Sequence, residues 1–232
     1  MGLLKVFTLL FNKIPEGYVK NELRYFLMFN KLVPKRISSF APMNGYLKYF
    51  QPEEGDIVID AGAYPGDYSI YAARRVGKTG KVVCFEPDIK GYNKLIKIAK
   101  KAKVNNIIIL QKGLWCENKK VEMSSVTTMD NNQSDNNTLV ELVKLDDELK
   151  RLNIKKVNIL KMDIEGAEIQ AIKGCKNILL SNEVKVSIAS YHIVNNEKTS
   201  VFIEQYLSDL DYKVITEYPS HLTTYAWKNK KK

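Results

Sequence analysis

Apolar runs of strand length alternate with amphipathic runs of helical length along most of this chain, starting at Gly55. Strands are expected over residues 57–61, 81–86, 106–111, 157–163 and 185–191. Helices are expected over residues 67–76, 91–103, 167–180 and 198–209. Alternation of this kind is typical of parallel strands joined by helical crossovers, so it predicts an α/β sandwich with a parallel sheet.

Two segments interrupt the alternation. Residues 112–145 contain a hairpin pattern and then a polar run, Met129 to Asn137, which cannot supply core and is expected to form a surface loop. After the last helix come two more apolar runs, 212–217 and 222–227. They predict a terminal antiparallel hairpin, which extends the five parallel strands to a seven-stranded, mostly parallel sheet.

Residues 1–50 have a helical pattern that ends in turn signals, including Pro42 and Gly45. We therefore expect N-terminal helices over 1–50, followed by a single domain over 51–232. The uncharged run Val6 to Asn12 is too short to span a bilayer, which needs about 20 apolar residues. It predicts a helix packed on the domain, with a membrane-surface helix as the alternative.

The formal net charge of +10 first suggests a nucleic acid, an anionic membrane surface or an acidic substrate. Its distribution narrows that suggestion. Residues 1–36 carry seven basic and two acidic residues, and four more lysines lie between 228 and 232. The stretch 37–227 holds 25 basic and 24 acidic residues and is almost neutral. The excess positive charge therefore lies at the two ends of the chain. It is compatible with a peripheral contact with an anionic surface or substrate.

Three cysteines, Cys84, Cys116 and Cys175, lie far apart and form no Cys-x-x-Cys pair. An odd number without such pairs argues against a disulfide scaffold and against a cysteine-based zinc site. Because no signal peptide is recognisable either, we expect a reducing, cytoplasmic setting.

The first predicted strand runs into a glycine-rich loop, Asp60-Ala-Gly-Ala-Tyr-Pro-Gly66. Glycines here let the backbone turn sharply from strand to helix and approach a ligand closely. Dinucleotide sites use GxGxxG, with a helix N-terminus facing the pyrophosphate. Here a carboxylate precedes the first glycine, and it would repel pyrophosphate but suit a cationic, amino-bearing ligand such as S-adenosylmethionine. A merely tight strand–helix turn is the simpler interpretation.

The second predicted strand ends at Glu86, followed by Pro87. A carboxylate at the end of the strand next to the glycine loop can accept both ribose hydroxyls of an adenosyl group. Its position after the glycine loop fits that role better than the role of a surface residue before a proline turn. Together the two strand ends favour an adenosylmethionine site over a nicotinamide site.

The fourth predicted strand leads into a second acidic cluster, Asp163-Ile-Glu165-Gly-Ala-Glu168, and the fifth leads to His192. Ligands of open α/β sheets bind outside the carboxyl ends of the strands. We therefore expect Asp163, Glu165 and His192 to share one crevice with the acidic groups of the first two strands. For Glu168, a negative charge favoured at a helix N-terminus is at least as good an interpretation as a catalytic role.

Five motifs, in this order, resemble those of FkbM-type methyltransferases. They are Asp60-x-Gly-Ala-x-x-Gly-Asp-Tyr-Ser69, Phe85-Glu-Pro87, Gly113-Leu114, Lys144-Leu-Asp-Asp147 and Lys161-x-Asp-Ile-Glu-Gly-Ala-Glu168. The Asp-Ile-Glu-Gly-Ala-Glu run is the most specific. The resemblance implies a Rossmann-like class I methyltransferase fold and S-adenosylmethionine as cofactor. It also implies methylation of a hydroxyl, often on a sugar, a glycoconjugate or a small metabolite.

The resemblance further implies which residues bind the cofactor. Asp60, Gly62, Ala63, Tyr64 and Gly66 would line its methionine side, Glu86 would hold the ribose, and Gly113 and Leu114 would flank the adenine. Tyr68, Ser69, Pro87 and Asp163 complete the expected cofactor-binding set. The fifth strand of such proteins commonly ends Glu-x-His, whereas Ser190 takes the first place here.

A hydroxyl acceptor must lose its proton during methyl transfer. We expect His192 to be the general base, with Asp163 or Glu165 orienting it or acting directly. The same side chains leave a second interpretation open, a divalent cation that lowers the acceptor pKa. No metal is predicted.

Two other functions remain open. The basic ends and six lysines between residues 90 and 103 favour an RNA methyltransferase, but no Asp/Asn-Pro-Pro-Tyr/Phe motif for base amines is found. A non-catalytic protein that docks on membranes or partners through its ends is the other alternative. The intact carboxylate and glycine motifs argue against it. We expect a small-molecule or glycan acceptor as partner, and the sequence indicates no oligomeric state.

Overall fold

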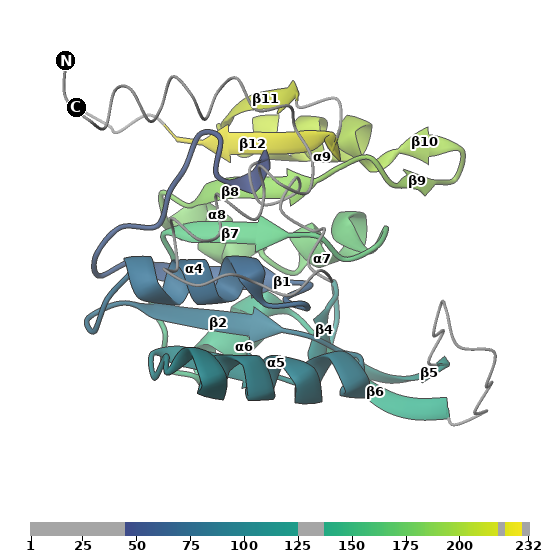
Figure 1. Cartoon of the computed structure of the whole chain (residues 1–232). Coiled ribbons are helices and arrows are strands. Elements are labelled where there is room, and N and C mark those ends of the chain that lie inside the picture. Colours follow the sequence, from purple (N-terminus) through teal and green to yellow (C-terminus); the bar gives the residue numbers. More distant parts are fainter. Residues whose placement is uncertain (1–44, 125–136, 218–220, 229–232) are drawn as a thin grey trace, which may run out of the picture. The chain divides into compact units, whose positions relative to one another are not determined.

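A computed structural model describes residues 45–124, 137–217 and 221–228 (Figure 1). They belong to one unit, Gly45–Lys232. The predicted N-terminal helices and most of the predicted polar loop lie outside the described residues, so both stay predictions, as does the domain boundary at residue 50. None of the described helices is long and apolar enough to cross a membrane.

Seven strands form the central sheet, in the order β11-β12-β8-β7-β1-β2-β3. Five of them are parallel: β1 Ile57–Ala61, β2 Lys81–Phe85, β3 Ile107–Leu110, β7 Ile159–Met162 and β8 Lys185–Ala189. At one edge, β12 Thr223–Trp227 runs antiparallel to both β8 and β11 Lys213–Glu217. The predicted Rossmann-like α/β fold, with a mostly parallel sheet and a C-terminal antiparallel hairpin, is confirmed.

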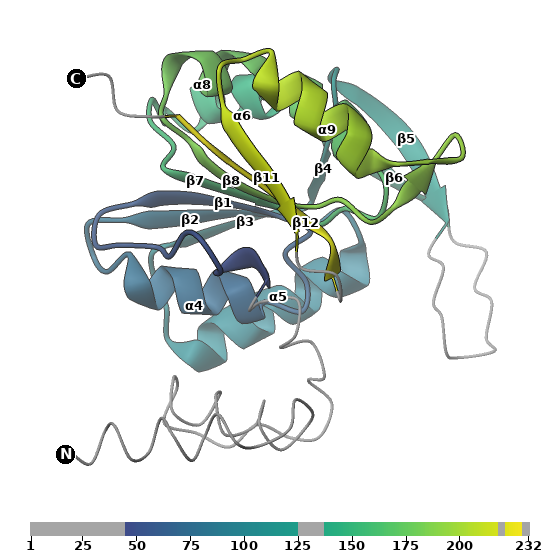
Figure 2. The same ribbon diagram turned by 90° about the horizontal axis from the view of Figure 1, so that it is seen from above.

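Helices cover both faces of this sheet (Figure 2). One face carries α4 Asp67–Arg75 and α5 Ile89–Ala102; the other carries α6 Leu145–Arg151, α8 Lys176–Ser181 and α9 Thr199–Ser208. Successive strand residues point to opposite faces. Val58 and Ile59 of β1 are nevertheless both 0% exposed, because each face is packed against helices. This double coverage explains why the strands are continuous apolar runs rather than alternating ones.

The helix predicted over 167–180 is wrong as one element. It is divided into α7 Glu168–Lys173 and α8, and the two meet at Gly174. A Cβ on Gly174 would lie 2.1 Å from the carbonyl oxygen of Trp115, so the backbone is pressed against another segment at this point. That tertiary contact overrides the helical periodicity of the local sequence.

A second, three-stranded sheet is formed by β4 Lys112–Leu114, β5 Lys119–Ser124 and β6 Asn137–Val143. β5 and β6 pair antiparallel, and β4 adds a strand parallel to β6. A hairpin was expected in this segment ahead of the polar run, but the paired strands lie before and after residues 125–136. The short helix α6 that follows was not predicted. A further small hairpin, β9 Ile193–Val194 with β10 Glu197–Lys198, begins directly after His192.

Candidate functional site

The glycine loop, residues 61–66, follows β1 and is held from two sides. The amides of Gly62 and Ala63 both donate to the Phe85 carbonyl at the end of β2, at 3.0 and 3.2 Å. On the other side, a Cβ on Gly62 would lie only 1.7 Å from the carbonyl oxygen of Asp163. Gly62 also has a positive φ of 75°. Only glycine can occupy this position, because both the backbone conformation and the close approach exclude a side chain.

Gly66 caps α4 with a φ of 101°, and a Cβ there would lie 2.7 Å from a methyl carbon of Leu95 in α5. The two glycines that the sequence singled out therefore have different roles. Gly62 lets β1 approach the end of β7, and Gly66 lets the start of α4 approach α5. Between them Ala63 is buried and Tyr64 is 44% exposed.

Asp60, predicted to face a cationic ligand, is 0% exposed. Its Oδ2 accepts a hydrogen bond from Ser69 Oγ at 2.5 Å, and its Oδ1 lies 2.9 Å from Lys161 Nζ. Ser69 in turn accepts a bond from Cys84 Sγ and is itself fully buried. Tyr68 is also buried beside this group. Asp60 and Ser69 thus lie beneath the glycine loop, and their direct contact with a cofactor stays a prediction.

Glu86 lies at the carboxyl end of β2, as expected, and is 8% exposed. One carboxylate oxygen accepts the amide hydrogen of Tyr64 and the other accepts that of Asp88, each at 3.1 Å. Burial raises the pKa of Glu86, although these two amides lower it in part. Each oxygen keeps a lone pair for a further donor, such as a ribose hydroxyl.

The predicted adenine side follows from β4. Gly113 and Leu114 are buried, and a Cβ on Gly113 would lie 3.7 Å from a ring carbon of Pro87. The segment therefore adjoins the end of β2, next to Glu86. Which face of a cofactor it would contact stays a prediction.

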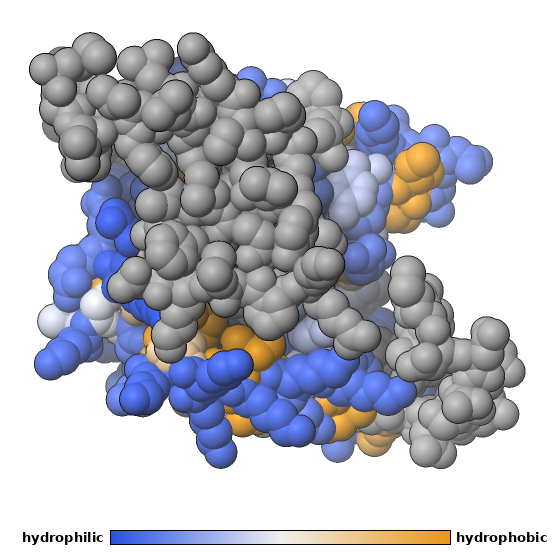
Figure 3. Space-filling view, viewed as in Figure 1, coloured by the Kyte–Doolittle hydropathy of each residue, from blue (hydrophilic) through white to orange (hydrophobic). Residues whose placement is uncertain are grey.

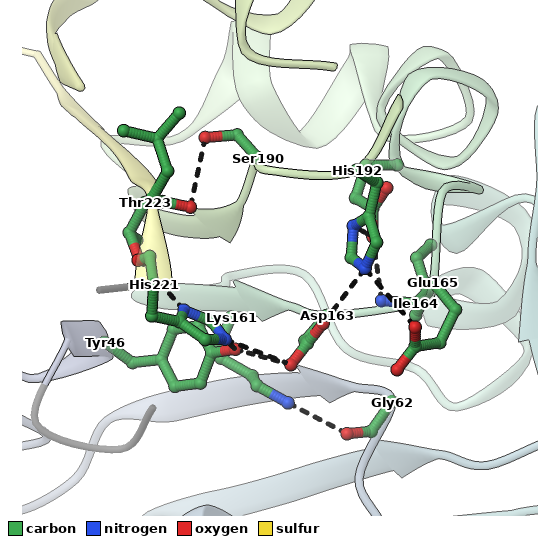
Figure 4. Close-up of polar contacts among 12 residues, drawn as sticks. Tyr46, Gly62, Lys161, Asp163, Ile164, Glu165, Ser190, His192, His221 and Thr223 are labelled. Atoms are coloured by element: carbon green, nitrogen blue, oxygen red, sulfur yellow. Dashed lines mark hydrogen bonds and ion pairs between the residues drawn. The ribbon is translucent and has the colours of Figure 1, made fainter. Parts of the chain in front are cut away.

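A polar cluster occupies the carboxyl ends of β7 and β8 (Figure 4). It consists of Tyr46, Asp163, Glu165, Glu168, His192 and His221. Tyr46 Oη donates to Asp163 Oδ2 at 2.6 Å. His192 Nε2 lies 3.4 Å from Glu165 Oε2 and 4.0 Å from Asp163 Oδ1. The three predicted catalytic residues are therefore brought together.

Asp163 is the centre of the cluster. Its burial alone would raise the pKa of this carboxyl, but His221, Lys161 and Tyr46 outweigh it and hold the pKa at about 2. Burial and the neighbouring Asp163 raise the pKa of Tyr46 far above its usual range. The proton of this pair therefore stays on the tyrosine, and Asp163 is ionised at neutral pH.

Glu168 lies in the first turn of α7, but its carboxylate turns back toward the loop before the helix. Its Oε1 accepts the amide hydrogens of Ile164 and Gly166, at 2.9 and 3.3 Å, and lies 3.1 Å from His192 Nδ1. Burial lowers the pKa of His192, but the Glu168 carboxylate outweighs this and raises it. Glu168 thus faces the imidazole as well as the helix terminus.

Sequence reasoning assigned no role to Tyr46, Lys161 or His221. Tyr46 lies in the segment that we placed in the N-terminal extension, and nothing local indicated its bond to Asp163. His221 precedes β12, and the pairing of Thr223 with Ala189 brings it to the carboxyl edge of β8. The predicted terminal hairpin implied this position of His221. A strand that runs antiparallel to β8 begins at the edge of the sheet where β8 ends.

Asp163, Glu165 and His192 also satisfy the geometry of a cation site, since one ligand atom of each lies within 4.8 Å of the others. Asp163 Oδ1 and Nε2 of His192 are buried without a hydrogen-bond partner among the described residues. These atoms can be satisfied by an acceptor hydroxyl or by a divalent cation. The metal interpretation therefore stays open on geometry.

Residues 60–214 match a family model described as the methyltransferase FkbM domain. No curated protein matches the chain at a significant level. The matched segment begins at Asp60 and ends within β11, so it contains both the glycine loop and all of the polar cluster except Tyr46 and His221.

Solved structures share the fold at low sequence identity. A methyltransferase FkbM from Methylobacillus flagellatus KT is 17% identical with a TM-score of 0.63 over 97% of this chain, which spans only 58% of that protein. A SAM-dependent methyltransferase from Aquifex aeolicus is 17% identical, with a TM-score of 0.50 over 84% of this chain and 93% of its own. Fibrillarin from Aeropyrum pernix, solved with bound S-adenosyl-L-methionine, is 12% identical. Its TM-score is 0.52, and the match covers 81% of this chain and 73% of the fibrillarin chain.

Proposed function

The chain belongs to the FkbM family of methyltransferases, with S-adenosylmethionine as cofactor, and we propose that it methylates a hydroxyl group of a sugar, a glycoconjugate or a small metabolite. One observation carries the proposal. A histidine and two carboxylates of the polar cluster converge next to the glycine loop, where the backbone of Gly62 touches that of Asp163. A base suited to a hydroxyl proton therefore adjoins the predicted cofactor site.

The residues of the glycine loop fit this cofactor. Gly62 near the start of the loop has no side chain, so a ligand can approach its backbone closely. The remaining lone pairs of the Glu86 carboxylate suit ribose hydroxyls. When bound, S-adenosylmethionine supplies the electrophilic methyl group. The remaining catalysis falls to this chain, which must align the acceptor and exclude water.

His192 is the proposed general base. The buried Glu168 lies 3.1 Å from its Nδ1, nearer than the exposed Glu165 lies to its Nε2, so we assign the proton of the neutral ring to Nδ1 and the lone pair to Nε2. The raised pKa makes the imidazole a stronger base than an unperturbed histidine. Asp163, ionised and held by Tyr46, would stabilise the imidazolium that forms on proton transfer.

The charge of the cluster supports a neutral acceptor over a phosphate-bearing one. Three carboxylates surround His192, and the side chain of Glu165 is 87% exposed at the rim. Such a field repels phosphate. The five lysines of α5 and Lys103 directly after it are all exposed, and the surface over this helix is largely hydrophilic (Figure 3). They fit a solvated helix face, which weakens their support for RNA.

We expect labelled methyl groups to appear in glycan or small-molecule fractions when the protein is incubated with labelled cofactor and fractionated cell extract. The product should be an ether that resists alkali, because a hydroxyl is methylated. A His192→Ala variant supplies the blank for each fraction. Label in RNA that declines steeply with salt would instead establish the RNA alternative, and label in neither class would contradict the proposed acceptor.

We expect methyl transfer to persist undiminished in a metal chelator. The third candidate ligand, Glu165, has a side chain that is 87% exposed on a residue of positive φ, so it is poorly fixed for a cation. A base mechanism needs only His192. The test compares turnover with and without chelator in the wild type and in Glu165→Gln. Loss of turnover that magnesium restores, with a higher magnesium requirement in Glu165→Gln, would contradict the metal-free mechanism.

A further inference from the structure

Lys161 is a charged residue in the middle of the central sheet. It lies in β7 between Leu160 and Met162, which are both 0% exposed, and is itself only 5% exposed. Burying an ammonium group is costly unless all of its donors are paired. Its partners therefore show what the position is used for.

Among the described residues, the three polar partners of Lys161 belong to one short segment. Its Nζ lies 2.9 Å from Asp60 Oδ1, and it donates to the carbonyls of Gly62 at 2.8 Å and Ala61 at 3.3 Å. Asp60 and Lys161 are direct neighbours in the parallel pairing of β1 and β7. One lysine therefore joins β7 to the turn at which the glycine loop begins, through two hydrogen bonds and one ion pair.

This contact changes the role expected of Asp60. The carboxylate was predicted to attract the cationic cofactor, but it is fully buried. Ser69 donates to its Oδ2, and its Oδ1 is ion-paired with Lys161 although it accepts no hydrogen bond from the described residues. The glycine loop is also bonded to Glu86, because the amide of Tyr64 in this loop donates to Glu86 Oε2. A shift of the loop would therefore disturb both the methionine side and the ribose side of the cofactor site.

We propose that Lys161 is a positioning residue of the cofactor site, which fixes the glycine loop through the Ala61 and Gly62 carbonyls, and that Asp60 acts on the cofactor only through this lysine. The rings of Tyr46 and Tyr68 lie 5.1 and 6.0 Å from Nζ. They shield the contact from water, which strengthens it.

The test uses two ligands and needs no acceptor, so its outcome is independent of the proposed hydroxyl substrate. S-adenosylhomocysteine carries the amino-acid part, whereas 5′-methylthioadenosine lacks it. In the double variant Asp60→Asn/Lys161→Met, which leaves no unpaired charge, we expect calorimetric Kd values for both ligands to rise about tenfold or more. The single variant Asp60→Asn keeps the lysine on the two carbonyls and should raise both Kd values less than about threefold.

Lys228→Met is the matched control. Lys228 also donates to two successive carbonyls, those of Leu179 and Leu180, beside the ring of Tyr212, but at the end of α8. Its loss should lower the unfolding temperature and leave both Kd values unchanged.

Unchanged binding in the double variant would overturn the proposal, since the pair would then be purely structural. A loss confined to S-adenosylhomocysteine, in either Asp60 variant, would also overturn it, because Asp60 would then contact the amino group directly. If the double variant does not fold, Asp60→Asn/Lys161→Gln, which also leaves no unpaired charge, takes its place: both Kd values should rise, and unchanged values would overturn the proposal.

Discussion

Replacing His192 with alanine is expected to lower the rate constant of methyl transfer about 10²–10⁴-fold, the usual contribution of a general base. The affinity for S-adenosylhomocysteine should remain near that of the wild type. The ion pairs and ring contact of His192 among the described residues are with Asp163, Glu165, Glu168 and Tyr191, not with the glycine loop. Single-turnover rates with the identified acceptor, together with calorimetry of the product, measure the two quantities separately.

Two further variants make this test specific. Glu168→Gln retains a carbonyl oxygen for the amides of Ile164 and Gly166 but removes the charge beside Nδ1, so it should slow turnover by less than His192→Ala. Glu197→Gln changes an exposed carboxylate on the hairpin that follows His192, and it should have no effect. Near-normal turnover in His192→Ala, with cofactor binding intact, would show that another group removes the proton.

Much of this site was predictable because the topology gathers distant residues at one edge. Asp60, Glu86, Asp163 and His192 are far apart in sequence, yet each follows or ends a parallel strand, and the strand pattern alone places them together. The strands were recognisable as continuous apolar runs because helices cover both faces of the sheet. The family motifs lie in these same segments.

The parts that were missed depend on contacts that no local pattern encodes. Tyr46 reaches Asp163 from a segment 117 positions earlier. Lys161 belongs to one of the family motifs, but its partner Asp60 lies on the neighbouring strand β1, and only the pairing register brings them together. The break at Gly174 similarly depends on Trp115 in another element. In each case the tertiary neighbour, rather than the residue type, determines the role.

Gly62→Ala is expected to be the most damaging single-methyl change in the described part of the chain. The added Cβ would lie 1.7 Å from the Asp163 carbonyl oxygen and 2.8 Å from its carbon, so two backbone segments must separate. We expect the free energy of unfolding to fall by about 3–5 kcal/mol. Because the separation displaces the glycine loop from the end of β7, kcat/KM should also fall about 10²-fold. Thermal unfolding and product calorimetry measure the two effects.

Gly55→Ala is the control that isolates this contact from backbone strain. Gly55 has a similar positive φ, 84° against 75° for Gly62, but a Cβ there meets only Thr79 Oγ1 at an ordinary 3.6 Å. Alanine at a positive φ costs about 1–2 kcal/mol by itself, so Gly55→Ala should lower stability modestly and leave cofactor binding unchanged. If both variants lost the same stability and both bound S-adenosylhomocysteine normally, the close approach of Gly62 to Asp163 would have no functional consequence. The glycine loop and the polar cluster would then not depend on each other for their positions.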